Sequence, residues 1–248
     1  MKPSDVQILI VDDEPLMLET IGDLFETFQF QVDKAKSGNH AWSLCEKKSY
    51  NLVLSDVRMP DGDGIELIKK IKAKDAVSPS VLFMSGFSDL MNEEIYHLGA
   101  EGKFTKPFDN QAVRTAIQKC LLTPEARWTQ TVPILARRPL NIEKIGNTVA
   151  ELQTQKSVLF GRGGLFISHA FAPPEKGTIV TFSIQIRDPE RLVFTGTGIV
   201  RWIQNPGKLN VPPGLGIEII QMDPKHAKNY NILFGRLVPF IPSAVRSQ

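Results

Sequence analysis

An apolar strand followed by an amphipathic helix recurs five times in the first half of this 248-residue chain. In the first repeat, the apolar run 6–11 is followed by Pro15, which opens a helix at a position where its missing N–H costs nothing. Such alternation predicts a doubly wound α/β unit, in which helices cover both faces of a five-stranded parallel sheet. We expect its strands at residues 6–11, 30–35, 51–55, 80–84 and 103–105.

Polar residues follow four of these strands. Asp12 and Asp13 come after the first, Asp56 after the third, Ser85 after the fourth and Lys106 after the fifth. Because parallel strands end at one edge of the sheet, these side chains should converge. Three close carboxylates repel one another, and Mg²⁺, which takes oxygen ligands, relieves that repulsion. The pattern predicts that Asp56 is a nucleophile that accepts a phosphoryl group, with Mg²⁺ and Lys106 neutralising charge and the Ser85 hydroxyl donating a hydrogen bond.

Each of these residues also has a plainer interpretation when it is taken alone. Asp12, Asp13 or Ser85 can cap the helix that follows it, and Asp56 can be an ordinary turn residue. Lys106 can be a solvated surface lysine. We favour the shared site because every one of the five follows a strand.

The same residues resemble the receiver domain of two-component response regulators over residues 5–122. The likeness rests on four short motifs: Asp12-Asp13, Asp56 with Met59-Pro60 and Gly62/Gly64, Ser85-Gly86, and Lys106-Pro107-Phe108. It implies that Asp13 and Asp56 ligate Mg²⁺ directly, with the backbone carbonyl of Arg58 as a third ligand, and that Asp12 acts through a metal-bound water. It also implies a cis Lys106-Pro107 bond and a sensor histidine kinase or phosphotransfer protein as partner. A receiver that keeps these residues without being phosphorylated is the alternative.

One position departs from the receiver pattern. Receivers usually carry an aromatic residue three positions before the lysine, and this chain has Lys103 there. Phe104 is adjacent, but successive strand residues face opposite sides of a sheet, so Phe104 should not replace it. We therefore expect the signal to pass through the Ser85 loop and the fourth helix.

The second half of the chain has a different character. Residues 1–122 carry 14 basic and 19 acidic residues, whereas residues 123–248 carry 15 basic and 8 acidic residues. The basic excess of the second half fits either an anionic partner or an ordinary solvated face. Prolines punctuate residues 123–139 and predict a linker between a domain at 1–122 and one at 140–248. Short β-branched and aromatic runs after residue 140 predict a small antiparallel barrel or sandwich, with a C-terminal helix from Asp223-Pro224.

This second half resembles a PilZ domain, a small β-barrel that in many cases binds cyclic di-GMP. The likeness rests on 158–167, 176–180, 198–202 and 213–217. The family binds its ligand through Arg-x-x-x-Arg and Asp/Asn-x-Ser-x-x-Gly, and here Leu159 and Gly161 replace the polar turn residues. Arg137, Arg138 and Arg162 are the remaining candidates for dinucleotide binding, since arginine grips phosphates and guanine edges bidentately. The glycines of 161–164 have a structural alternative, a tight hairpin or bulge.

Together these features predict a bacterial signalling protein that is not an enzyme. Phosphorylation of Asp56 would change how a PilZ-like output domain contacts a downstream protein or a second copy in a homodimer; the alternative is a dual-input receptor that also binds cyclic di-GMP. A DNA-binding regulator is disfavoured, because no helix-turn-helix pattern is present. The chain shows no signal peptide and no apolar stretch long enough to span a bilayer, and Cys45 and Cys120 fit buried free thiols, so we expect a cytoplasmic protein without membrane insertion.

Overall fold

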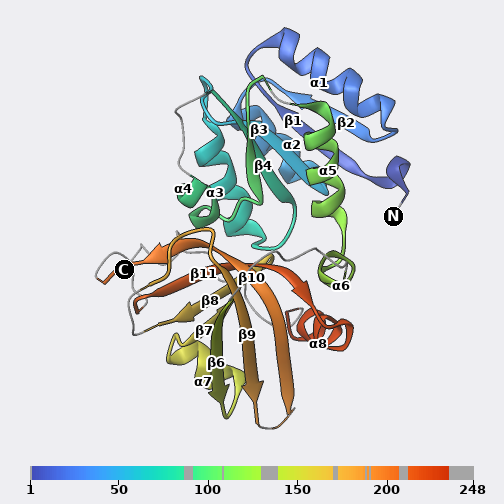
Figure 1. Cartoon of the computed structure of the whole chain (residues 1–248). Coiled ribbons are helices and arrows are strands. Elements are labelled where there is room, and N and C mark those ends of the chain that lie inside the picture. The colour runs from blue at the N-terminus through green and yellow to red at the C-terminus, as the bar shows by residue number, and fades with distance from the viewer. Residues whose placement is uncertain are drawn as a thin grey trace. The chain divides into compact units, whose positions relative to one another are not determined.

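The structure, a computed structural model, describes residues 2–86, 92–107, 109–129, 139–169, 173–187, 189, 191–206 and 212–234. The chain forms two compact units that divide between Leu121 and Leu122, close to the predicted domain end at residue 122. Figure 1 shows the first unit in blue to green and the second in green to red. Among the described residues, no helix is both long and apolar enough to cross a membrane.

The first unit contains a five-stranded sheet in the order β2-β1-β3-β4-β5, and every pair in it is parallel. Its strands are β1 Gln7–Val11, β2 Gln31–Ala35, β3 Leu52–Asp56, β4 Ser80–Ser85 and β5 Gly102–Thr105. The helices are α1 Pro15–Thr27, α2 Gly38–Lys47, α3 Gly64–Lys74, α4 Asn92–His97 and α5 Asn110–Leu121, with a 3₁₀ turn η1 at Pro3–Asp5. The predicted doubly wound fold is confirmed, and each strand lies within one residue of its expected ends.

Two hydrophobic cores lie on opposite faces of this sheet because successive strand residues point to opposite sides. Ile8 and Ile10 of β1 pack with α1 and α5, whereas Leu9 and Val11 pack with α2, α3 and α4. Figure 1 shows α1 and α5 together on one side of the sheet. With both faces covered, β3 and β4 are buried at every residue, as continuous apolar strands of a parallel sheet should be.

The second unit contains a six-stranded sheet in the order β6-β9-β10-β11-β8-β7. Its strands are β6 Leu140–Gly146, β7 Val158–Phe160, β8 Gly164–Ser168, β9 Ile179–Ile186, β10 Leu192–Gln204 and β11 Gly214–Met222. The pairs are antiparallel except β6 with β9, which is parallel. The sheet is strongly curled, as Figure 1 shows, and β6 and β7 are its two edges. The small antiparallel barrel or sandwich that we expected is, in the described residues, a curled half-barrel, and the parallel pair of β6 with β9 corrects the purely antiparallel prediction.

The helices of the second unit include one that the sequence interpretation placed in a linker. They are α6 Pro124–Trp128, α7 Val149–Thr154 and the predicted C-terminal helix, α8 Pro224–Phe234. Trp128 is completely buried, with its ring centroid 5.0 Å from that of Tyr230 in α8. Phe160 and Phe194 surround the same tyrosine, each at 5.8 Å. The start of the predicted linker 123–139 therefore belongs to the core of the second unit, while residues 130–138 lie outside the described residues.

Candidate functional site

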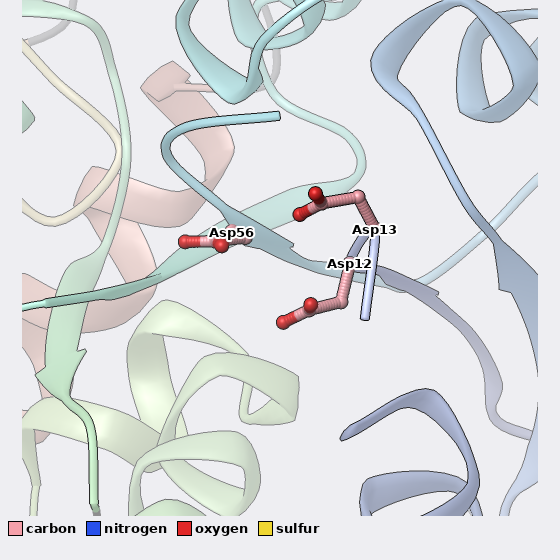
Figure 2. Close-up of side chains that lie close together, drawn as sticks. All are labelled: Asp12, Asp13 and Asp56. Atoms are coloured by element: carbon pink, nitrogen blue, oxygen red, sulfur yellow. The ribbon is translucent and has the colours of Figure 1, made fainter. Parts of the chain in front are cut away.

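Three carboxylates meet at the carboxyl edge of the parallel sheet. Asp12 and Asp13 directly follow β1, and Asp56 is the last residue of the neighbouring strand β3. Parallel pairing of Val11 with Ser55 brings the two strand ends level. Ligand oxygens of the three side chains all lie within 4.8 Å of one another, and Figure 2 shows them grouped at this edge. The predicted convergence of these side chains is therefore present in the structure.

Lys106, which follows β5, links two of the carboxylates. Its Nζ donates to Asp12 Oδ2 at 2.7 Å and to Asp56 Oδ2 at 3.1 Å. The other oxygens are also held: Asp12 Oδ1 accepts from the Glu14 N–H at 3.0 Å, and Asp56 Oδ1 accepts from the Val57 N–H at 2.7 Å. Two donors thus fix the orientation of each carboxylate, whereas Asp13 is exposed to solvent.

Burial and charge act against each other at this site. Burial raises the pKa of Asp56, and the hydrogen bond and charge of Lys106 oppose that rise without cancelling it. For Lys106, burial favours the neutral amine, but the bonds to Asp12 and Asp56 outweigh it and hold the pKa above its usual value. The lysine is therefore charged at neutral pH and partly compensates a cluster that still carries net negative charge.

A hydroxyl group without a partner completes the edge. Ser85 ends β4 and is completely buried, and its Oγ has no hydrogen-bond partner in the described part of the chain. The Ser85 carbonyl accepts from the Lys106 N–H at 2.8 Å, which ties the two strand ends together. The Lys106-Pro107 bond is cis, as the receiver resemblance implied. A buried hydroxyl is costly to leave unpaired, so Ser85 is poised for an acceptor that a bound group would bring.

The loop between β3 and α3 is fastened to the start of α2, where the sequence analysis singled out neither Ser37 nor Gly38. Ser37 caps α2 and its hydroxyl also donates to Asp61 Oδ2 at 2.9 Å, while the Gly38 N–H donates to the Gly62 carbonyl at 2.8 Å. Asp61 and Gly62 have φ values of 58° and 91°, a left-handed turn that favours Asp/Asn and Gly. The Asp-Gly pair was a visible turn signal, but its partner 24 residues earlier was not. This loop also carries Arg58, whose carbonyl stays a predicted metal ligand.

Gly64 gives a direct test of how tightly this loop is packed against Asp56. A Cβ at Gly64 would lie 2.2 Å from the Asp56 carbonyl oxygen, whereas a Cβ at Gly102 would meet nothing closer than Leu82 Cδ2 at 3.7 Å. Gly64→Ala is therefore expected to destabilise the first unit by about 1–3 kcal/mol, and Gly102→Ala to change its stability little. Urea denaturation of both variants measures the difference. Equal stability of the two variants would contradict this close approach.

The unusual Lys103 lies where the sequence placed it. It is on β5 opposite Phe83, a residue of the core formed with α2, α3 and α4, while Phe104 packs on the other face with α1 and α5. The two side chains point to opposite sides of the sheet, so the expectation that Phe104 does not replace an aromatic residue at 103 is confirmed.

The glycine-rich turn of the second unit has a structural role. The Gly161 N–H donates to the Gly164 carbonyl at 2.9 Å, closing the β7–β8 hairpin, and the Tyr230 hydroxyl donates to the carbonyls of both glycines at 2.8 and 3.1 Å. A Cβ at Gly164 would lie 2.0 Å from the Ile217 carbonyl oxygen. The hairpin interpretation is confirmed. Arg162 lies in this turn, partly exposed, and Arg137 and Arg138 lie outside the described residues.

Comparison with known proteins connects the first unit to a family. The sequence profile of the response regulator receiver domain matches residues 8–118. The chain is 35% identical over 116 residues to sporulation initiation phosphotransferase F of Bacillus subtilis, covering 46% of this chain and 93% of that protein. It is 32% identical over 116 residues to chemotaxis protein CheY of Halobacterium salinarum, covering 46% of this chain and 96% of that protein.

Other relatives are larger or were found by structure. The chain also matches several transcriptional regulatory proteins, but the alignments cover only 26% to 58% of the length of those proteins. A response regulator receiver domain protein from Clostridium thermocellum aligns with a TM-score of 0.45 at 26% identity, covering 47% of this chain and 94% of that one. All these alignments cover less than half of the chain.

Proposed function

The chain belongs to the response regulator receiver domain family, and on that premise we propose that Asp56 is its phosphoryl acceptor. The observation that carries the proposal is the environment of Asp56: a buried carboxylate, oriented by Val57 and Lys106, within 4.8 Å of two further carboxylates. Burying a carboxylate without hydrogen-bond donors would cost stability. A carboxylate that fixed donors orient at the edge of a sheet is suited to attack an electrophile. Intact-mass spectrometry after incubation with acetyl phosphate and Mg²⁺ tests the proposal.

The chemistry assigned to each residue follows from its contacts. An Asp56 oxygen forms a bond to phosphorus while the bond from phosphorus to a donor imidazole nitrogen breaks, as a sensor histidine kinase or phosphotransfer protein would supply it. Lys106 stays charged and neutralises a phosphoryl oxygen. The Ser85 hydroxyl would donate to a phosphoryl oxygen, an acceptor that the described residues do not offer it. A carboxylate nucleophile has no proton to lose when it attacks, so the step needs no general base.

Mg²⁺ is the cofactor that the donor set fits. Asp12, Asp13 and Asp56 offer only carboxylate oxygens, the ligand type that Mg²⁺ prefers, and they are close enough to share one ion. Asp13 and Asp56 with the Arg58 carbonyl would hold it directly, and Asp12 through water. When bound, the ion would neutralise negative charge that Lys106 leaves uncompensated.

Comparing Ser85→Ala with Ser55→Ala separates a hydroxyl expected to assist phosphorylation, Ser85, from one expected to stabilise the fold, Ser55. Ser85→Ala removes a buried hydroxyl that has no partner among the described residues, so the stability of the first unit should hold or rise, while phosphorylation by acetyl phosphate should slow by about tenfold. Ser55→Ala removes a hydrogen bond of 2.8 Å to the Asp56 carbonyl and should cost about 1 kcal/mol of stability. Thermal unfolding and time-resolved phosphorylation of both variants provide the measurements. A Ser85→Ala variant that is phosphorylated as fast as wild type would remove Ser85 from the site.

We further propose that the second unit is a PilZ-like output domain that acts by binding a protein. Leu122 and Thr123 alone separate the end of α5 from α6, and α6 is held in the core of the second unit through Trp128. A displacement of α5 after phosphorylation would therefore reach the output domain through a short connection. Pull-down with phosphorylated and unphosphorylated full-length chain, together with the oligomeric state of both forms, tests whether the partner is another protein or a second copy.

Cyclic di-GMP binding is the alternative for the second unit. The hairpin that would carry the ligand turn is occupied by Tyr230 and by contacts with β11, which supports a structural role for its glycines. Calorimetric titration of the full-length chain with cyclic di-GMP distinguishes the two proposals. Heat that disappears in an Arg137→Ala/Arg138→Ala/Arg162→Ala variant would favour the dual-input receptor.

A further inference from the structure

A cavity of about 580 Å³ lies in the second unit, away from the glycine hairpin. It is bordered by the end of β8, the end of β10 and the start of β11, and Lys144 of β6 reaches it. Its size falls within the range of small-molecule sites. Ser168 marks this end of β8, four residues along the strand from Gly164, so the cavity is about 13 Å from the turn that carries Arg162.

Lys144 occupies a position that belongs to the core face of its strand. In the parallel pair with β9, Ile142 is level with Phe182, Lys144 with Ile184 and Gly146 with Ile186. All of these neighbours are buried, and residue 144 points to the same side as they do because side chains alternate along a strand. An apolar residue would be expected there, so a lysine needs an explanation.

The ammonium of Lys144 has little to compensate its burial. Its only hydrogen bond is a long one, 3.4 Å to Ser168 Oγ, and no carboxylate pairs with it in the described part of the chain. None of the described residues that line the cavity is Asp or Glu. Burial lowers the pKa of Lys144, in keeping with a positive charge that lacks a counter-ion.

Gln204 is a second polar residue at a core-facing strand position, this time on β10. The inward residues Val200 and Trp202 of β10 are buried, and Gln204 follows them at the next inward position, only 3% exposed. Its Nε2 donates to the Asn205 carbonyl at 2.8 Å. Pro206, Pro213 and Leu215 supply an apolar wall beside it. A cationic end, a buried amide and an apolar wall in one cavity are the features of a site for an amphiphilic small molecule.

We propose that this cavity binds a small organic anion, a carboxylate or phosphate monoester. The anionic group would pair with Lys144 and accept from the Ser168 hydroxyl, and the apolar body would lie against the prolines. The ligand supplies the counter-ion that Lys144 lacks, which explains a lysine on a core face. None of the residues that line the cavity belongs to the phosphoryl-acceptor site, and Arg162 is not among them either.

Calorimetric titration of the full-length chain with phenyl phosphate, benzoate and neutral benzyl alcohol tests this site. At least one anion is expected to bind, and its Kd should rise by about tenfold or more in Lys144→Met. Lys228→Met, which removes an exposed lysine of α8 in the same unit, should leave the Kd unchanged. The tighter of the two anions identifies the head group as phosphate or carboxylate.

A second readout follows the wild-type chain and needs a variant, the conservative Lys144→Arg, only for assignment. In wild-type chain with reductively ¹³C-methylated lysines, the Lys144 signal, assigned by its loss in Lys144→Arg, should shift when the anion is added. Binding that is equal in wild type and Lys144→Met, equal binding of benzyl alcohol, or no heat and no shift with either anion would overturn the proposal.

Discussion

Replacing Asp56 by Asn should abolish phosphorylation of the chain by acetyl phosphate and Mg²⁺. The amide keeps the size of the side chain, but its single oxygen can replace only one of the two carboxylate oxygens that accept from Val57 and Lys106, and it is not a nucleophile. Intact-mass spectrometry should show one added phosphoryl group on the wild type and none on Asp56→Asn. This is the largest effect expected at the site, because every other residue there assists a bond that Asp56 itself forms.

A matched variant separates this loss from a general effect of removing a carboxylate. Asp75→Asn changes an exposed residue after α3 whose Oδ1 accepts from the Val77 and Ser78 N–H groups, and an asparagine oxygen can do the same. It should be phosphorylated like wild type. Stability should not explain the loss either, since Asp56→Asn removes one of three neighbouring negative charges and should not destabilise the first unit in metal-free buffer. A phosphoryl group that persists in Asp56→Asn would assign the acceptor to another residue.

The sequence was sufficient to locate this site because its geometry follows from topology. Once five strands are known to be parallel, residues that directly follow them must share an edge, so Asp12, Asp56, Ser85 and Lys106 could be brought together without coordinates. Continuous apolar runs also predicted the strand ends to within one residue. The hydrogen bond between Ser37 and Asp61 could not be predicted in this way, since it depends on how two loops meet rather than on a periodic pattern.

The second unit was predicted less completely for related reasons. Side chains of β6 alternate between the core and solvent, but Lys144 stands at one of the positions that face the core. The sequence of β6 therefore lacks the regular apolar pattern that predicts a strand. Its parallel pairing with β9 could not be inferred from hairpin signals, which indicate antiparallel neighbours. Helix α6 has five residues and lies among prolines, too short to show a helical period, and its partner Tyr230 is about a hundred residues away.

Trp128→Ala should therefore destabilise the second unit by about 3–5 kcal/mol, the usual cost of truncating a large buried aromatic side chain. Trp128 is completely buried against Tyr230, and its removal leaves a cavity beside this tyrosine, which also packs against Phe160 and Phe194. The Nε1 atom of Trp128 has no hydrogen-bond partner in the described part of the chain, so Trp128→Phe keeps most of the packing and should cost clearly less. Trp42→Ala in the first unit, where the ring is only partly buried, is the matched control.

The two units can be followed separately in urea by fluorine NMR with fluorotryptophan, because Trp42 reports on the first unit and Trp202 on the second. In Trp128→Ala the Trp202 transition should move to lower urea while the Trp42 transition stays in place, and Asp56 should still accept a phosphoryl group. Because only Leu122 and Thr123 separate α6 from α5, loosening α6 should instead remove any effect of phosphorylation on partner binding or oligomeric state. If the Trp42 and Trp202 transitions moved together in Trp128→Ala, the two units would unfold as one cooperative unit. The connection through α6 would then be a rigid structural link and not one that phosphorylation changes.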